Sequence, residues 1–145
     1  MRVLLSCVSP IASALLLWPV LAAADGALAV GQPADPKQGF SYGIAWDVPR
    51  EEARARALAR CRGEGAPQAA AALCRVIETF ANQCVAVALD PGAGRPGVGW
   101  AIGASQEAAE GEALRKCQET AQRGRRRLCR VISSRCDGRG AAKQG

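Results

Sequence analysis

The sequence of 145 residues contains no histidine. Histidine is the side chain that most often serves as a general base, and it is the commonest metal ligand. Its absence excludes the Ser-His and Cys-His pairs that activate a nucleophile. The C-x-x-C spacing, which is typical of zinc sites and thiol oxidoreductases, is also missing. We therefore expect no metal site, no cofactor and no recognisable catalytic residue.

Two kinds of catalytic site work without histidine, and the sequence has no motif for either. The lysines Lys37, Lys116 and Lys143 are scattered, whereas a Ser-Lys dyad needs a buried lysine. Glutamates at 51–52 and 107–110 lie where helices are expected to begin, and the helix dipole favours negative charge there. A cell-envelope enzyme with an unrecognised Ser-Lys or carboxylate site is therefore an alternative hypothesis.

Aromatic residues make up only 4% of the chain, so the core has to be built from small aliphatic residues and cystine. Such a core buries little apolar surface per residue. Small domains with thin cores commonly depend on disulfides for stability.

Long apolar runs are absent after the first 24 residues. The N-terminus has a single charge at Arg2, an apolar run, and then Ala22, Ala23 and Ala24. This pattern is typical of a secretory signal peptide cleaved after Ala24, with cleavage after Ala29 as the alternative. No basic cluster follows the run, which argues against a membrane anchor. We expect a secreted or periplasmic protein with no transmembrane segment after cleavage.

Six cysteines remain once the signal peptide is removed. An even number of cysteines in a short exported chain predicts a disulfide framework. The six residues are Cys61, Cys74, Cys84, Cys117, Cys129 and Cys136.

The segment LCRVI occurs twice, at residues 73–77 and 128–132. Each copy follows the pattern A-x-x-x-A-L-x-x-C, whose spacing places the named residues on one face of a helix. A short apolar segment with an aromatic residue precedes each helix. We predict an α+β fold in which two β-α-β repeat units form one roughly five-stranded sheet, with both helices on one face and disulfides holding the layers.

The expected elements follow from these patterns. Strands are expected at about 42–46, 73–80, 84–89, 98–102 and 128–134, with a hairpin turn in the glycine-rich stretch 92–99, and helices at about 49–62 and 106–123. The expected domain organisation is a signal peptide (1–24), a flexible leader (25–39), one domain (40–137) made of repeats 40–89 and 97–136, and a flexible tail (138–145).

These motifs resemble a known family. Two copies of an aromatic-small-Ile segment, of A-x-x-x-A-L-x-x-C and of C-R-V-I, behind a signal peptide, are similar to the bacterial exported family called domain of unknown function 4189. The resemblance covers residues 42–136 and implies a small, exported, cysteine-paired protein with no established activity. This chain has less Trp and Gly in its first strand region, and more Arg in its second half, than the family usually shows.

Two of the disulfides follow from helical periodicity, out of the 15 pairings that six cysteines allow. Cys61 and Cys117 lie on the apolar faces of the two expected helices. Each is followed by a cysteine at the start of the next strand, Cys74 or Cys129. We expect the bonds Cys61–Cys74 and Cys117–Cys129.

The remaining pair is Cys84–Cys136. Cys129 and Cys136 are seven residues apart, so an unbroken strand places them on opposite faces. Cys84 lies on the less apolar side of its own strand. We expect this bond on the face of the sheet that points away from the helices.

Positive charge is concentrated late in the chain. Residues 97–145 hold 10 basic and 5 acidic side chains, whereas residues 25–96 hold 8 of each. The candidate anion-binding residues are Arg123, Arg125, Arg126, Arg127 and Arg130. Lipid headgroups, lipopolysaccharide, acidic glycans or an acidic protein are the candidate partners, because nucleic acid is less accessible outside the cytoplasm. A solvated connector without a ligand is the plain alternative.

The leading hypothesis for function is an exported, non-catalytic binding or inhibitor module whose ligand the sequence does not identify. It would use the exposed face of the sheet or the arginine-rich connector. The alternatives are the envelope enzyme described above and a purely structural envelope protein.

Overall fold

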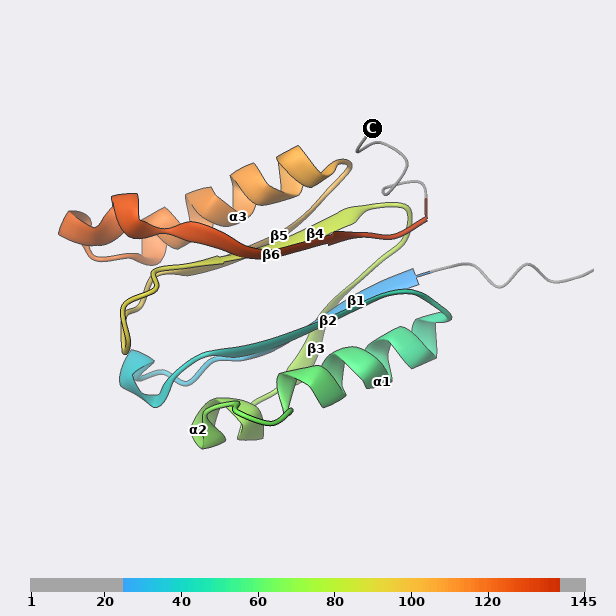
Figure 1. Cartoon of the computed structure of the whole chain (residues 1–145), viewed down its shortest axis with the longest axis horizontal. Helices are drawn as coiled ribbons and strands as arrows, with labels where there is room; N and C mark the ends of the chain where they lie inside the picture. The colour runs from blue at the N-terminus through green and yellow to red at the C-terminus, as the bar shows by residue number, and fades with distance from the viewer. Residues whose placement is uncertain (1–24, 139–145) are drawn as a thin grey trace, which may run out of the picture.

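Four layers, helix–sheet–sheet–helix, make up the part of the chain that the computed structural model describes, residues 25–138 (Figure 1). The expected signal peptide and residues 139–145 of the expected tail lie outside this range. The first sheet has the strand order β2 (Ser41–Val48), β1 (Asp25–Gly31), β3 (Arg75–Phe80), and the second has the order β5 (Val98–Gly103), β4 (Cys84–Leu89), β6 (Arg130–Cys136). All neighbouring strands are antiparallel.

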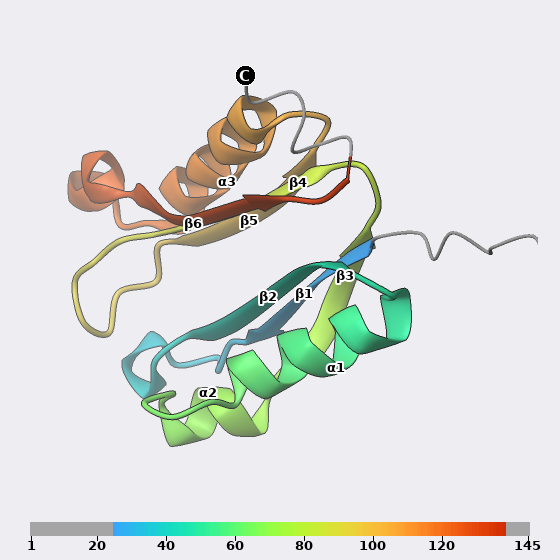
Figure 2. The same ribbon diagram turned by 45° about the vertical axis from the view of Figure 1, so that its right-hand side comes forward.

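Helices cover the outer face of each sheet, as Figures 1 and 2 show. Helix α1 (Arg50–Cys61) packs on the first sheet and α3 (Gln106–Thr120) on the second. Three short helical segments complete the fold: η1 (Pro36–Gln38), α2 (Gln68–Ala72) and η2 (Arg123–Leu128).

The expected single sheet is therefore wrong, whereas the expected hairpin turn at residues 92–99 does join two paired antiparallel strands, β4 and β5. Strand β3 pairs with β1, whereas β4 pairs with β5 and β6. The chain crosses from one sheet to the other at residues 81–83. The physical reason is that the central strands β1 and β4 are buried almost throughout. A central strand buried on both faces needs a second layer opposite the helix, and here each sheet supplies that layer for the other.

The expected flexible leader is also corrected. Residues 25–31 form β1, the central strand of the first sheet, and all seven residues are buried. As a result each half of the structure has the same order of elements, strand–strand–helix–strand, over residues 25–80 and 84–136. The segment 84–89, which we had expected in the first repeat, belongs to the second half.

Both copies of LCRVI end at a β-bulge. Between β1 and β3 the register shifts from Leu28↔Glu78 to Ala29↔Val76, which leaves Ile77 without a partner. The same shift between β4 and β6 leaves Ile132 without a partner. Both isoleucine side chains pack in the layer between the sheets. A bulge adds one residue to a strand and so changes which face the residues beyond it occupy.

The layers differ in composition. Each helix packs on its sheet through alanine and cysteine, whereas the five aromatic residues of the described chain lie between the sheets. Glycine brings each helix onto the strand backbone. A Cβ on Gly43 would lie 2.1 Å from the Ala57 carbonyl oxygen, and one on Gly99 would lie 2.2 Å from that of Ala113. Small residues on both surfaces thus allow a close helix–sheet approach.

The disulfides join the pairs expected from the sequence: Cys61–Cys74, Cys117–Cys129 and Cys84–Cys136. The expected position of the third bond is wrong, because Cys84 and Cys136 lie in the core against α3. The bulge at Ile132 reverses the alternation of β6 and brings both of its flanking cysteines to the helix side. Within residues 25–138, no disulfide joins one half to the other.

Candidate functional site

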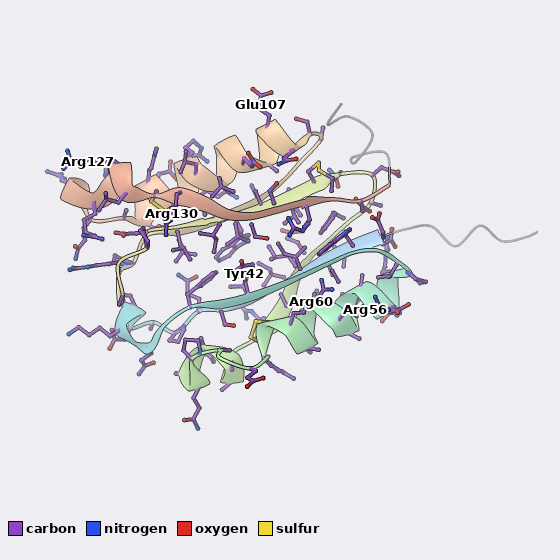
Figure 3. All side chains as sticks on the ribbon, in the orientation of Figure 1. Tyr42, Arg56, Arg60, Glu107, Arg127 and Arg130 are labelled. Carbon is purple, nitrogen blue, oxygen red and sulfur yellow. A yellow bond between two sulfur atoms is a disulfide. The ribbon has the colours of Figure 1, made fainter. Side chains whose placement is uncertain are left out.

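The arginine-rich segment forms η2, which connects α3 to β6 at the left-hand end of the molecule in Figure 1. Four of the five predicted anion-binding side chains are exposed: Arg123, Arg126, Arg127 and Arg130. Figure 3 shows two of them, Arg127 and Arg130, at this end. We call these four residues the arginine-rich end.

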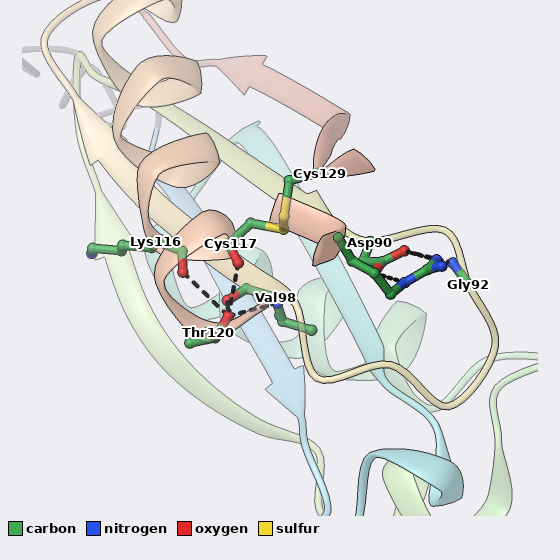
Figure 4. Close-up of a disulfide and its surroundings, with 8 residues drawn as sticks. Asp90, Gly92, Val98, Lys116, Cys117, Thr120 and Cys129 are labelled. Carbon is green, nitrogen blue, oxygen red and sulfur yellow. Dashed lines mark hydrogen bonds and ion pairs between the residues drawn. A yellow bond between two sulfur atoms is a disulfide. The ribbon is translucent and has the colours of Figure 1, made fainter. Parts of the chain in front are cut away.

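The fifth candidate, Arg125, is used inside the structure. Its Nε and Nη2 lie 2.6 and 2.7 Å from the two carboxylate oxygens of Asp90, whose side chain is only 1% exposed. The Gly92 amide donates a third hydrogen bond, of 2.9 Å, to Asp90 (Figure 4). The bond from Arg125 is the main reason that the pKa of Asp90 falls to about 2, and the Gly92 amide adds to the effect. Arg125 therefore anchors η2 to the 90–97 loop.

The end of α3 fixes η2 from the other side. The Thr120 hydroxyl accepts a hydrogen bond from the Val98 amide and donates toward the Val98 carbonyl, both at 2.9 Å (Figure 4). The Cys117–Cys129 bond then ties the residue after η2 back to the helix. The backbone that carries the arginine-rich end is thus held at both of its ends.

Two further features lie close to the arginine-rich end. Leu128, the first residue of the second LCRVI, is 39% exposed beside these charges. A cavity of about 280 Å³ opens between segments 32–40 and 89–98, and Asp90 and Arg95 are among its lining residues. The C-terminus of α3 carries partial negative charge and directly precedes η2. Attraction to this helix end explains part of the clustering of arginines in η2 without any ligand.

Two of the serines and one of the lysines considered for the alternative catalytic site have other partners, whereas the buried Ser134 hydroxyl has no hydrogen-bond partner within the range that the structure describes. Ser41 donates to the Cys61 carbonyl, and Ser105 caps α3 by accepting from the Ala108 amide. Lys116 donates to the Trp100 carbonyl at 3.1 Å. Lys143 lies outside the described residues. Among residues 25–138, no serine hydroxyl bonds to a lysine amine, and no group of three or more acidic, cysteine or histidine side chains is placed to hold a metal ion.

A buried carboxylate that the sequence did not single out is Asp137. It accepts hydrogen bonds from the Asn82 and Gln83 amides, at 3.3 and 3.0 Å, and its burial raises its pKa. These bonds fasten the end of β6 to the turn at which the chain passes from one sheet to the other. Its role in the described structure is therefore to fix the end of β6 against the start of its neighbour β4.

Comparison with known proteins places the chain in a family. No helix among residues 25–138 is long and apolar enough to cross a membrane. No match was found among curated proteins, and none among solved structures. The profile of the family described as domain of unknown function (DUF4189) matches residues 25–136, from the first strand to the last. The chain belongs to the DUF4189 family, as its repeated motifs had indicated.

Proposed function

We propose that this protein is an exported, non-catalytic binding module that attaches to an anionic component of the cell envelope through its arginine-rich end. The observation that carries the proposal is the contrast between two sets of arginines. On the helices, arginines pair with glutamates one turn away: Arg54 with Glu51, Arg56 with Glu52, and Arg115 with Glu112 and Glu119. No such pair within residues 25–138 involves Arg123, Arg126, Arg127 or Arg130.

The fixed backbone under these side chains supports the proposal. A guanidinium presents five donors in a planar fork that fits carboxylates and phosphates. Because Asp90–Arg125 and Cys117–Cys129 hold η2 in place, binding does not require the connector to become ordered. The charge excess of residues 97–145 would also increase the encounter rate with a negative surface.

Export is supported by the N-terminal signal-peptide pattern and by the three disulfides, which are typical of oxidising compartments. The non-catalytic part of the proposal is supported by the absence of histidine and by the structural hydrogen bonds of Ser41, Ser105 and Lys116.

Binding to lipid vesicles tests the proposal with a matched control. The oxidised chain 25–145 is mixed with vesicles of anionic or neutral lipid, and the bound fraction is measured by sedimentation. The test variant carries Arg123→Gln, Arg126→Gln and Arg127→Gln. The control variant carries Arg54→Gln, Arg56→Gln and Arg115→Gln, which removes the same charge from the helices. Arg125 stays unchanged because it anchors the loop.

We expect the wild type and the helix control to bind anionic vesicles, and the test variant to bind at least tenfold more weakly. Binding should fade as salt is added, because the screening length falls to about 8 Å at physiological ionic strength. Equal loss in both triple variants would show that net charge alone is responsible, and would contradict a site at the arginine-rich end.

A further inference from the structure

A second candidate site lies away from the arginine-rich end, where edge strand β2 of the first sheet faces edge strand β6 of the second. A groove of about 320 Å³ opens there. We call it the Trp46 groove, and its side chains are Tyr42, Ile44, Trp46, Arg60, Ser133 and Arg135. Figure 3 shows Tyr42 in the layer between the sheets and Arg60 on α1 beside that layer.

Two guanidinium groups from different layers meet at one indole ring. The Cζ atoms of Arg60 and Arg135 each lie 5.1 Å from the centre of the Trp46 ring. Arg60 extends from α1 and donates to the Ile44 carbonyl of β2, whereas Arg135 extends from β6 and donates to the Ser134 carbonyl at 2.6 Å. In the described part of the chain, neither guanidinium has a carboxylate partner.

The unbalanced charge is what points to a ligand. Each guanidinium has five N–H donors, and each uses one of them in the hydrogen bonds just given. Two positive charges around one ring repel each other, and an anion between them would relieve that repulsion. The neighbouring carboxylate, Asp47, accepts a bond from the Gly138 amide instead.

Comparison with the other half of the structure shows that protection of an edge strand explains Arg60 but not Arg135. There, Lys116 donates to the Trp100 carbonyl, as Arg60 does to Ile44. A cation over the outward carbonyl of an edge strand discourages pairing with another chain, and this accounts for Arg60 and Lys116 alike. The residue that corresponds to Arg135, three after the bulged isoleucine, is Phe80 in the first half. Arg135 is thus an addition to only one of the two edges.

The groove beside Trp100 also differs in its charge. Its lining includes Glu119 as well as Lys116, so it contains a carboxylate of its own. No acidic side chain is among the residues that line the Trp46 groove. A second strand is a poor occupant for the Trp46 groove, because Arg60 already covers the carbonyl that such a strand would use.

We propose that the Trp46 groove binds the carboxylate of a small organic acid between Arg60 and Arg135. The half-buried Tyr42 side chain and Ile44 supply an apolar wall for the body of the ligand, and the Ser133 hydroxyl supplies another hydrogen-bonding group. The volume is near the lower end for ligand pockets, which suits a small molecule. This inference goes beyond the proposed attachment to anionic surfaces and uses none of its four arginines.

Tryptophan fluorescence provides a local test. In the oxidised chain 25–145, the substitution Trp100→Phe leaves Trp46 as the only tryptophan. The probe is cyclohexanecarboxylate, titrated at constant ionic strength, with neutral cyclohexanemethanol and inorganic phosphate as comparisons. We expect a saturable change in Trp46 emission with the carboxylate alone. Saturation by the neutral alcohol or by phosphate at the same midpoint would overturn the assignment of an organic acid.

Variants then assign the binding to the two arginines. Isothermal titration calorimetry with the same carboxylate should show affinity at least tenfold weaker for Arg135→Gln and for Arg60→Gln. Lys116→Gln, at the corresponding edge, should leave the affinity unchanged. Near-ultraviolet circular dichroism checks that each variant is folded. Unchanged affinity in folded Arg135→Gln, or no heat with the wild type at millimolar probe, would contradict the proposal.

Discussion

Ile77 and Ile132 occupy the same place in the two sheets. Each is the unpaired residue of a bulge, and each packs in the layer between the sheets. The repeated LCRVI therefore places a cysteine against the helix and, three residues later, an isoleucine against the opposite sheet. The exposed leucine that begins each copy takes no part in either contact.

Truncating Ile132 should destabilise the protein through the layer between the sheets. We expect Ile132→Ala to lower the free energy of unfolding by about 2 kcal/mol, at the low end for buried isoleucine because the side chain is only partly buried. Leu128→Ala, in the same repeat but exposed, should change it by less than about 0.5 kcal/mol. Urea denaturation measures both values, and equal effects would contradict the assigned role of Ile132.

Adding one methyl group should have opposite effects at two glycines. A Cβ on Gly43 would overlap the Ala57 carbonyl, so Gly43→Ala should destabilise by about 1–3 kcal/mol or more. A Cβ on Gly111 would meet nothing within 4 Å, so Gly111→Ala in α3 should stabilise by about 1 kcal/mol. Thermal unfolding of the two variants checks the signs. A neutral Gly43→Ala would mean that α1 does not lie against β2.

Acid should weaken the anchor of η2. The pKa of Asp90 is about 2 in the folded chain, below the value of about 3.9 usual for aspartate in an unfolded chain. A lowered pKa gives stability that is present above the usual value and is lost as pH falls toward 2. We expect the melting temperature of the wild type to fall more steeply between pH 4 and pH 2 than that of Asp90→Asn. Identical slopes would show that the Asp90–Arg125 pair adds nothing to stability.

Processing of the N-terminus follows from the position of β1. Cleavage after Ala29 would remove most of the central strand of the first sheet, whereas cleavage after Ala24 leaves it whole. We expect the exported protein to begin at Asp25, as determined by mass spectrometry after cell fractionation. An uncleaved chain in the cytoplasm would contradict export. A start at Val30 would contradict the role of β1 as the central strand of the first sheet in the exported protein.

The helices and two of the disulfides, Cys61–Cys74 and Cys117–Cys129, could be predicted because they depend on local spacing. The pattern from Ala53 to Cys61 gives the buried face of α1 directly, and its repetition in α3 supports the same conclusion. The layers could not be predicted in this way. Strand β1 has glycine near both ends and no aromatic residue, so nothing local marks it as a central strand. Simple alternation along β6 assigned Cys136 to the face that points away from the helices. The bulge at Ile132 shifts the alternation, so Cys136 lies on the helix side.

The candidate site depends on contacts between distant residues, which local patterns do not reveal. The run of arginines was evident in the sequence, but the use of Arg125 as an anchor depends on Asp90, 35 residues earlier. The Trp46 groove takes its side chains from β2, α1 and β6, and it exists only because the two sheets face each other. In both cases the residue types were visible, whereas their partners were set by the four-layer arrangement.

Mapping of the bound surface by nuclear magnetic resonance tests the proposed function most directly. The ¹⁵N-labelled, oxidised chain 25–145 would be titrated with a heparin-derived hexasaccharide as a defined anionic probe. We predict that the largest amide shifts occur in residues 123–130, that they saturate, and that they disappear at high salt, while amides of α1 change little. Shifts concentrated on α1, or spread evenly over the molecule, would contradict the arginine-rich end as the binding surface.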